Sequence, residues 1–219
     1  MSDTTSLRPS SDVAFSPAVK NVQARRGSRQ AYAKKEEKGG FRTRVTPDLA
    51  EFLALATSFY LATASADGQP YVQHRGGPPG LLVIIDERTL AFADFRGNRQ
   101  YITTGNLSEN PRAQIFVMDY ASRHRVKIWG RARVVEDDAG LIARLFPAGY
   151  DARVEQALVF EIDAWDSNCQ QHIPQMFKAE DVAGTIQQFQ ARVRELDTEN
   201  AALKARIKAL ETITPSGGM

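Results

Sequence analysis

The sequence lacks several features that would assign it to a class of proteins at once. Its 219 residues include one cysteine, Cys169, so an intramolecular disulfide framework is excluded and a reducing compartment is expected. The net charge of +2 gives no electrostatic argument for nucleic-acid binding. No apolar run approaches the roughly 20 residues that span a bilayer, and the polar N-terminus has no apolar signal region. We therefore expect a cytoplasmic protein without a nucleic-acid or membrane partner.

Familiar nucleotide and metal motifs are also missing. The loop Gly76-Gly77-Pro78-Pro79-Gly80 lacks the Lys-Ser/Thr that completes a P-loop. Cys169 and His172 have C-x-x-H spacing, but two ligands do not make a zinc site, and His74 and His124 do not complete one. No base is implied beside Cys169 that would make it a nucleophile. We expect no metal site.

The chain divides into three segments by composition. Residues 1–45 form an N-terminal extension with a basic helix, broken at Gly27, which we expect to be solvated and to pack through Val22, Ala31 and Tyr32. In an alternative interpretation, its basic cluster contacts RNA or acidic lipid. This alternative is less favoured because Glu36 interrupts the run of positive charge. A central domain covers 46–177, and a helical tail covers 178–219.

The central domain has the pattern of an antiparallel β-protein. Short runs rich in β-branched and aromatic residues alternate with turn signals such as Asp67-Gly68, which predicts hairpins. The expected strands are 59–64, 70–74, 81–86, 89–94, 113–120, 126–135 and 157–165. Short helices are expected from Thr46-Pro47, over 98–107 and over 137–146. This order favours an antiparallel barrel, mainly β with flanking α-helices.

The stretch Tyr71–Tyr101 contains the candidate binding site. Arg75 ends one expected strand, and Arg99 lies where a helix is expected to begin at Asn98. Two fixed cations beside the free N–H groups of a helix start would bind an anion. We interpret the stretch as a cradle for the phosphate of a flavin nucleotide.

The tail has a heptad pattern. Apolar residues recur at alternating spacings of three and four from Ile186 to Leu210, with Asn200 at one a position. β-Branched residues at a, Leu at d and one Asn at a are typical of a parallel two-stranded coiled coil. Three g-to-e pairs would join opposite charges: Arg192 with Asp197, Glu199 with Lys204, and Arg206 with Glu211. The coil is expected to extend a dimer made by the barrels; in the alternative, the helix folds back onto its own domain.

Longer motifs in the central domain resemble a known family. The runs HRGG, FADFRGNRQY and FVMDYASRHRVKIWGRARVV resemble the pyridoxamine 5'-phosphate oxidase-like flavoproteins, the FMN-binding split barrels, over roughly residues 45–165. The resemblance implies a split β-barrel, a homodimer, and FMN in a groove between the two barrels. It implies these cofactor-binding residues: Arg75, Ala93, Asp94, Asn98, Arg99, Gln100 and Arg125. We add His172, which would either lie near the flavin ring or be hydrogen-bonded within a capping loop.

The roles implied by the resemblance differ between these residues. Arg75, Asn98 and Arg99 would contact the phosphate, and Ala93 and Asp94 would border the flavin and its ribityl chain. Arg125 falls where the oxidases have a glutamine that reaches the flavin from the other subunit.

The sequence also departs from that of the true oxidases. Val83 and Gln100 stand where they have lysines, and their C-terminal Trp and Arg-x-His elements have no counterpart. We therefore do not expect oxidation of pyridoxamine phosphate.

Two functions of different kinds follow from these observations. The first is an FMN-dependent oxidoreductase acting on an unidentified small molecule with an unidentified electron donor. The alternative is a non-catalytic FMN carrier or redox-sensing module that signals through its coiled coil, with Gln170–Pro174 covering the flavin. A relative that uses deazaflavin or haem is a third possibility, which the absorption spectrum distinguishes.

Overall fold

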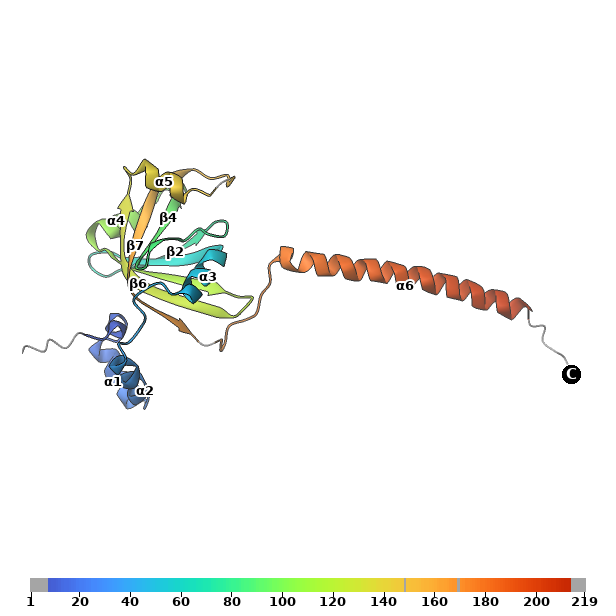
Figure 1. Ribbon diagram of the computed structural model, residues 1–219, viewed down its shortest axis with the longest axis horizontal. Helices are drawn as coiled ribbons and strands as arrows, with labels where there is room; N and C mark the ends of the chain where they lie inside the picture. Colours follow the sequence, from blue (N-terminus) through green and yellow to red (C-terminus); the bar gives the residue numbers. More distant parts are fainter. Residues whose placement is uncertain (1–7, 148, 169, 214–219) are drawn as a thin grey trace, which may run out of the picture. The chain divides into compact units, whose positions relative to one another are not determined.

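The computed structural model describes residues 8–147, 149–168 and 170–213, so Cys169 lies outside the described residues. The chain forms two compact units, Met1–Pro174 and Gln175–Met219 (Figure 1). The first contains all the strands, and the second is dominated by a single helix.

Within the described residues, seven strands form one sheet in which every neighbouring pair is antiparallel. The strands are β1 (Ser58–Ala64), β2 (Pro70–Gly76), β3 (Val83–Asp86), β4 (Thr89–Phe95), β5 (Arg112–Asp119), β6 (His124–Val135) and β7 (Val154–Asn168), in the order β2-β1-β5-β6-β7-β4-β3. The predicted mainly-β architecture is confirmed, and each predicted strand overlaps an observed one.

The sheet curls so that its two edge hairpins, β1–β2 and β3–β4, face one another. Phe59 of β1 and Phe92 of β4 meet edge to face with ring centroids 4.9 Å apart, and both are buried. Arg75 of β2 forms an ion pair with Asp94 of β4. No ladder pairs β2 with β3 or β4 among the described strands. Side chains rather than backbone hydrogen bonds therefore close the barrel along this line.

Helix α3 (Pro47–Leu55) contributes to the main core. Pro47 occupies the first turn, where its missing N–H costs nothing. Leu49 and Leu53, four positions apart on one face, are buried in the same apolar cluster as Phe59 and Trp165. The indole N–H of Trp165 donates to the backbone oxygen of Arg44 at 2.8 Å, which satisfies the polar atom of this buried ring.

A second, smaller core lies between the sheet and helix α5 (Ala139–Leu145), which is beside β4 and β7 in Figure 1. The carboxylate of Asp138 accepts from the N–H of Leu141 at 2.8 Å and caps the helix. Ala93 and Leu145 belong to this core. The opposite face of β4 presents Leu90 and Phe92 to the main core, so neighbouring residues at the end of β4 face different surroundings.

The N-terminal segment forms a short 3-10 helix, η1 (Ser10–Val13), followed by α1 (Pro17–Arg25) and α2 (Arg29–Glu37). The predicted apolar contacts through Val22 and Ala31 are wrong, because both side chains are exposed. Polar contacts join the helices instead: the amine of Lys20 lies 3.4 Å from Glu36, and Arg29 donates to the side-chain oxygen of Gln23 at 2.8 Å. Tyr32 contacts Phe15 edge to face at 5.1 Å, so this prediction failed only in part.

The second unit consists mainly of α6 (Ala179–Ile213), a single 35-residue helix. Among the described residues, none of the helices has the length and apolar character needed to cross a membrane.

Candidate functional site

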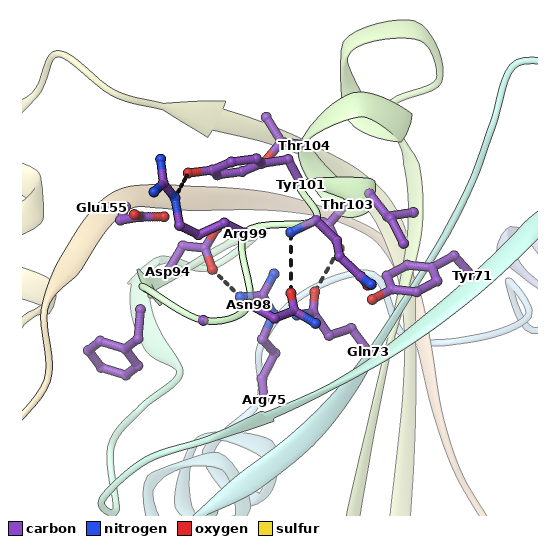
Figure 2. Close-up of a pocket in the computed structure, with 14 residues that line it drawn as sticks. Tyr71, Gln73, Arg75, Asp94, Asn98, Arg99, Tyr101, Thr103, Thr104 and Glu155 are labelled. Carbon is purple, nitrogen blue, oxygen red and sulfur yellow. Dashed lines mark hydrogen bonds and ion pairs between the residues drawn. The ribbon is translucent and has the colours of Figure 1, made fainter.

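A small cavity of about 50 Å³ lies where β2, the end of β4 and the start of helix α4 (Ile102–Glu109) meet (Figure 2). Tyr71, Gln73 and Arg75 line it from one face of β2, as the two-residue period of a strand requires. The loop 97–101 and Glu155 of β7 complete much of its wall. We call it the polar cavity because its lining is mostly charged or hydrogen-bonding.

Arg75 is held in place by a buried polar network. Its guanidinium donates to Asp94, and both side chains are largely buried. Gln156, which lies directly opposite Asp94 in the β4–β7 ladder, donates to the second carboxylate oxygen at 2.7 Å and lies 3.0 Å from the hydroxyl of Thr104. The network fixes the direction of Arg75 before any ligand arrives, which lowers the entropic cost of binding.

The loop on the other side of the cavity has an unusual backbone. Arg99 (φ 61°) and Tyr101 (φ 53°) are both in the left-handed region, which non-glycine residues adopt at a cost of roughly 1–3 kcal/mol. The Nε of Arg99 donates to the Tyr101 hydroxyl at 3.1 Å, and this bond, with the charge of Glu155 as a weaker cause, raises the pKa of Arg99. The guanidinium is fully charged and exposed.

The predicted start of the helix at Asn98 is wrong. The left-handed residue Tyr101 precedes the first turn, and α4 begins at Ile102. Asn98 instead accepts a hydrogen bond from the backbone N–H of Gln100 at 3.2 Å, which is a local turn contact. Any phosphate contact by Asn98 and Gln100 therefore comes from a loop and not from a helix terminus.

A larger cavity of about 340 Å³ adjoins the polar cavity. The two share four lining residues: Gln73, Arg75, Phe95 and Gly97. The larger one is also lined by apolar side chains from β1, β4 and the segment after α5, including Phe59, Leu145 and Tyr150. Its volume is within the range of roughly 300–1,000 Å³ that is typical of small-molecule sites.

Positive charge exceeds negative charge around the two cavities. Their lining includes three arginines and two carboxylates, Asp94 and Glu155. Arg96, on the larger cavity, lies 3.6 Å from Glu155. Because Asp94 already neutralises Arg75, the exposed Arg99 is the cation with most of its charge available to a ligand.

The structure brings most of the sequence-predicted site residues together. Five line the polar cavity: Arg75, Asp94, Asn98, Arg99 and Gln100. Ala93 lines the larger cavity. Arg125, on β6, and His172, which has left-handed backbone at φ 61°, line neither of these cavities.

Sequence reasoning missed Gln73, Thr104, Glu155 and Gln156. The two-residue period of a strand places Gln73 on the same face as Arg75, so Gln73 could have been predicted from the sequence. The other three depend on which strand pairs with β4, and a single sequence carries no signal for that pairing.

One donor of Arg75, beside the cavity, lacks a hydrogen-bond partner among the described residues. The Nε–H of Arg75 is buried and has no hydrogen-bond partner within the described part of the chain. A buried donor without a partner costs about 1–3 kcal/mol. In contrast, within residues 8–147, 149–168 and 170–213 no group of three or more His, Cys, Asp and Glu side chains is arranged to hold a metal ion.

Comparison with known proteins identifies the family. Residues 45–169, more than half of the chain, match the model of the family described as pyridoxamine 5'-phosphate oxidase. No curated protein matches the sequence.

Solved structures resemble this chain at low sequence identity. The HupZ protein of Group A Streptococcus is 13% identical, with 61% of this chain and 99% of that protein covered and a TM-score of 0.48. A Clostridium acetobutylicum protein related to general stress protein 26 is 14% identical, with coverages of 62% and 94% and a TM-score of 0.44. An FAD-binding protein of Mycobacterium smegmatis is 15% identical, with coverages of 57% and 96% and a TM-score of 0.39.

The matched residues include every described strand of the sheet and the three arginines that line the two cavities, Arg75, Arg96 and Arg99. The chain therefore belongs to the pyridoxamine 5'-phosphate oxidase-like family.

Proposed function

We propose that this chain is an FMN-binding flavoprotein and a flavin-dependent oxidoreductase. The observation that supports this most strongly is the arrangement of Arg75 and Arg99 around one small polar cavity that continues into a larger, partly apolar one. A molecule with a phosphate at one end and a flat aromatic ring system at the other matches that pair of cavities.

The phosphate would lie in the polar cavity. A guanidinium binds phosphate oxygens through paired charge-assisted hydrogen bonds, which are about twice as strong as neutral ones. Arg99 supplies the exposed charge, and Arg75 offers the donors that Asp94 does not use. The amide of Asn98 and the side chain of Gln100 add neutral hydrogen-bonding groups to the same wall.

The flavin ring would occupy the larger cavity. Phe59, Phe92 and Phe95 provide apolar surface there, and Ala93 leaves space beside the strand. When bound, FMN supplies the hydride and electron chemistry, while the protein supplies binding, orientation and exclusion of water.

Arg125 fits the proposal only through a second copy of the chain. It lies on β6 between its ladder partners Met118 and Asn168, away from both cavities of its own protomer. In the homodimer that we propose, Arg125 reaches the flavin bound to the partner. A cation beside the ring stabilises the reduced, anionic flavin.

The test is the absorption spectrum of the purified full-length protein after saturation with FMN and removal of free ligand. Mass spectrometry of the released ligand identifies it. We expect flavin bands and the mass of FMN at one per chain, with bleaching on addition of NADH, NADPH or a reducing substrate. Retention of FMN without bleaching by any donor would support the carrier or redox-sensing module. A haem or deazaflavin spectrum, or no retained chromophore, would contradict FMN binding.

A further inference from the structure

The long helix α6 presents a continuous apolar stripe that the folded chain leaves exposed. Its a and d positions include Ile186, Phe189, Val193, Leu196, Leu203 and Ile207, and their exposed fractions are 42–68%. An isolated helix is only marginally stable in water, and contiguous exposed apolar surface marks an interaction site. A partner that covers this stripe is therefore required to explain both the length and the pattern of the helix.

We propose that the partner is the α6 helix of a second copy of the chain, parallel and in register. The first argument is charge complementarity. In a parallel pair each g residue faces the e residue five positions later on the partner. Glu199 then meets Lys204, Arg206 meets Glu211, and Arg192 meets Asp197. Arg192 at present pairs with Glu195 of its own helix at 3.0 Å, and that exposed contact is easily exchanged.

The second argument is the polar residue in the stripe. Asn200 occupies an a position on the described helix, with Val193 and Ile207 at the neighbouring a positions. A parallel, in-register pair places the two Asn200 side chains opposite each other, where their amides hydrogen-bond. An antiparallel pair or a shifted register places each amide against an apolar side chain, which buries a polar group without a partner.

The parallel arrangement has a functional consequence. The barrel unit precedes α6 in sequence, so a parallel coil holds two barrel units at the same end. Tethering gives the second barrel a high effective concentration near the first, in the millimolar range for a short flexible connection. A weak contact between barrels would then form at low protein concentration. This inference does not depend on the identity of the ligand in the barrel.

Cysteine cross-linking in the full-length chain tests the arrangement. In a Cys169→Ser background, Phe189→Cys places a thiol at a d position near one end of the helix. Ala191→Cys, two residues away at position f, is the matched control. A parallel, in-register coil predicts that oxidation links most Phe189→Cys chains into dimers and at least fivefold fewer Ala191→Cys chains. Equal cross-linking of the two variants, or none at Phe189→Cys, would overturn the proposal.

A charge exchange tests the pairing directly. Glu199→Lys and Lys204→Glu alone each create two repulsive contacts in a dimer and should lower the melting temperature of the helix by about 5 °C. The double variant Glu199→Lys/Lys204→Glu restores the opposite charges and should recover the wild-type melting temperature. Helix melting is followed by far-UV circular dichroism at several protein concentrations. Single variants that melt like the wild type, or a double variant no better than either single variant, would contradict the parallel pairing.

Discussion

Arg75 links the stability of the barrel to the proposed binding of phosphate. Its guanidinium crosses from β2 to Asp94 on β4, along the line where no backbone ladder closes the described sheet. Both side chains are largely removed from water, so each charge depends on the other for compensation. The Nε–H of Arg75 is also buried, and it has no hydrogen-bond partner among the described residues.

Arg75→Ala should lower the free energy of unfolding by about 3 kcal/mol, because it leaves the buried carboxylate of Asp94 without its cation. The double variant Arg75→Met/Asp94→Leu should recover most of that loss. Arg44→Ala is the control, since Arg44 and Glu87 form a pair whose side chains are 63% and 58% exposed. That variant should change stability by less than about 1 kcal/mol. Urea titrations measure all three, and equal losses for Arg75→Ala and Arg44→Ala would contradict this account of the network.

Gly130 is the one position in β6 where a side chain would meet the neighbouring backbone directly. A Cβ there would lie 2.0 Å from the carbonyl oxygen of Glu161 and 2.6 Å from the ring of Phe160. Gly130→Ala should therefore cost more than about 2 kcal/mol by displacing β7. Gly105→Ala, on α4 with open space around it, should instead stabilise the protein by about 0.5–1 kcal/mol. Thermal unfolding of the two variants compares them, and a neutral Gly130→Ala would show that the strands separate at little cost.

The sequence predicted side chains that line the polar cavity better than it predicted the contacts that hold them in place. Arg75 and Arg99 stand out because fixed cations beside glycines are unusual, and the structure places both on the same cavity. Gln156 holds Asp94 and also contacts Thr104, and these positions are far apart in sequence. Their role follows from the pairing of β4 with β7, which local patterns do not encode.

Helices and strands were predictable where a period or a cap marks them, and less so at their ends. The motif Thr46-Pro47 gave the start of α3 correctly. The helix after β4 was placed four residues too early, because Asn98 resembles a cap and nothing in the sequence shows that Arg99 and Tyr101 adopt left-handed backbone. The apolar contacts expected for α1 and α2 failed because polar contacts join these helices, from Lys20 to Glu36 and from Arg29 to Gln23.

The pair of helices α1 and α2 should weaken in acid. The hydrogen bond from Arg29 lowers the pKa of Glu36 below its ordinary value of 4.5. The carboxylate therefore stabilises the fold above pH 4.5, and that stabilisation is lost as the pH falls through the lowered pKa. Glu36→Gln should be less stable than the wild type near neutrality. Between about pH 6 and about pH 3, the variant should lose less stability than the wild type does. Denaturant titrations at both values test this, and parallel curves for the two proteins would contradict it.

The chain as a whole combines a closed β-unit with a helical unit. The strand set and the antiparallel barrel were predictable from hairpin signals, but the order in which β7 lies between β6 and β4 was not. The pattern of a and d residues predicted one long helix, and α6 has that form.

The two units should unfold separately. Both tryptophans, Trp129 and Trp165, lie in the first unit, so tryptophan fluorescence reports on the barrel alone. Far-UV circular dichroism also reports on the 35-residue helix α6, so a transition seen there and not in the fluorescence belongs to the helical unit. We expect the helix transition to rise in temperature with protein concentration, as for any associating species, while the fluorescence transition moves less. Coincident transitions at every concentration would instead indicate one cooperative unit.

The most direct test of the proposed phosphate cavity is the ratio of the affinities for FMN and riboflavin, which differ only by the phosphate. We predict that the full-length protein binds FMN about 100-fold more tightly, the equivalent of about 3 kcal/mol from two charge-assisted contacts. In Arg99→Asn, which keeps a residue that tolerates left-handed backbone, the ratio should fall about tenfold. Equal affinities for the two flavins in the wild-type protein, or a ratio unchanged by Arg99→Asn, would contradict the assignment of this cavity to the phosphate.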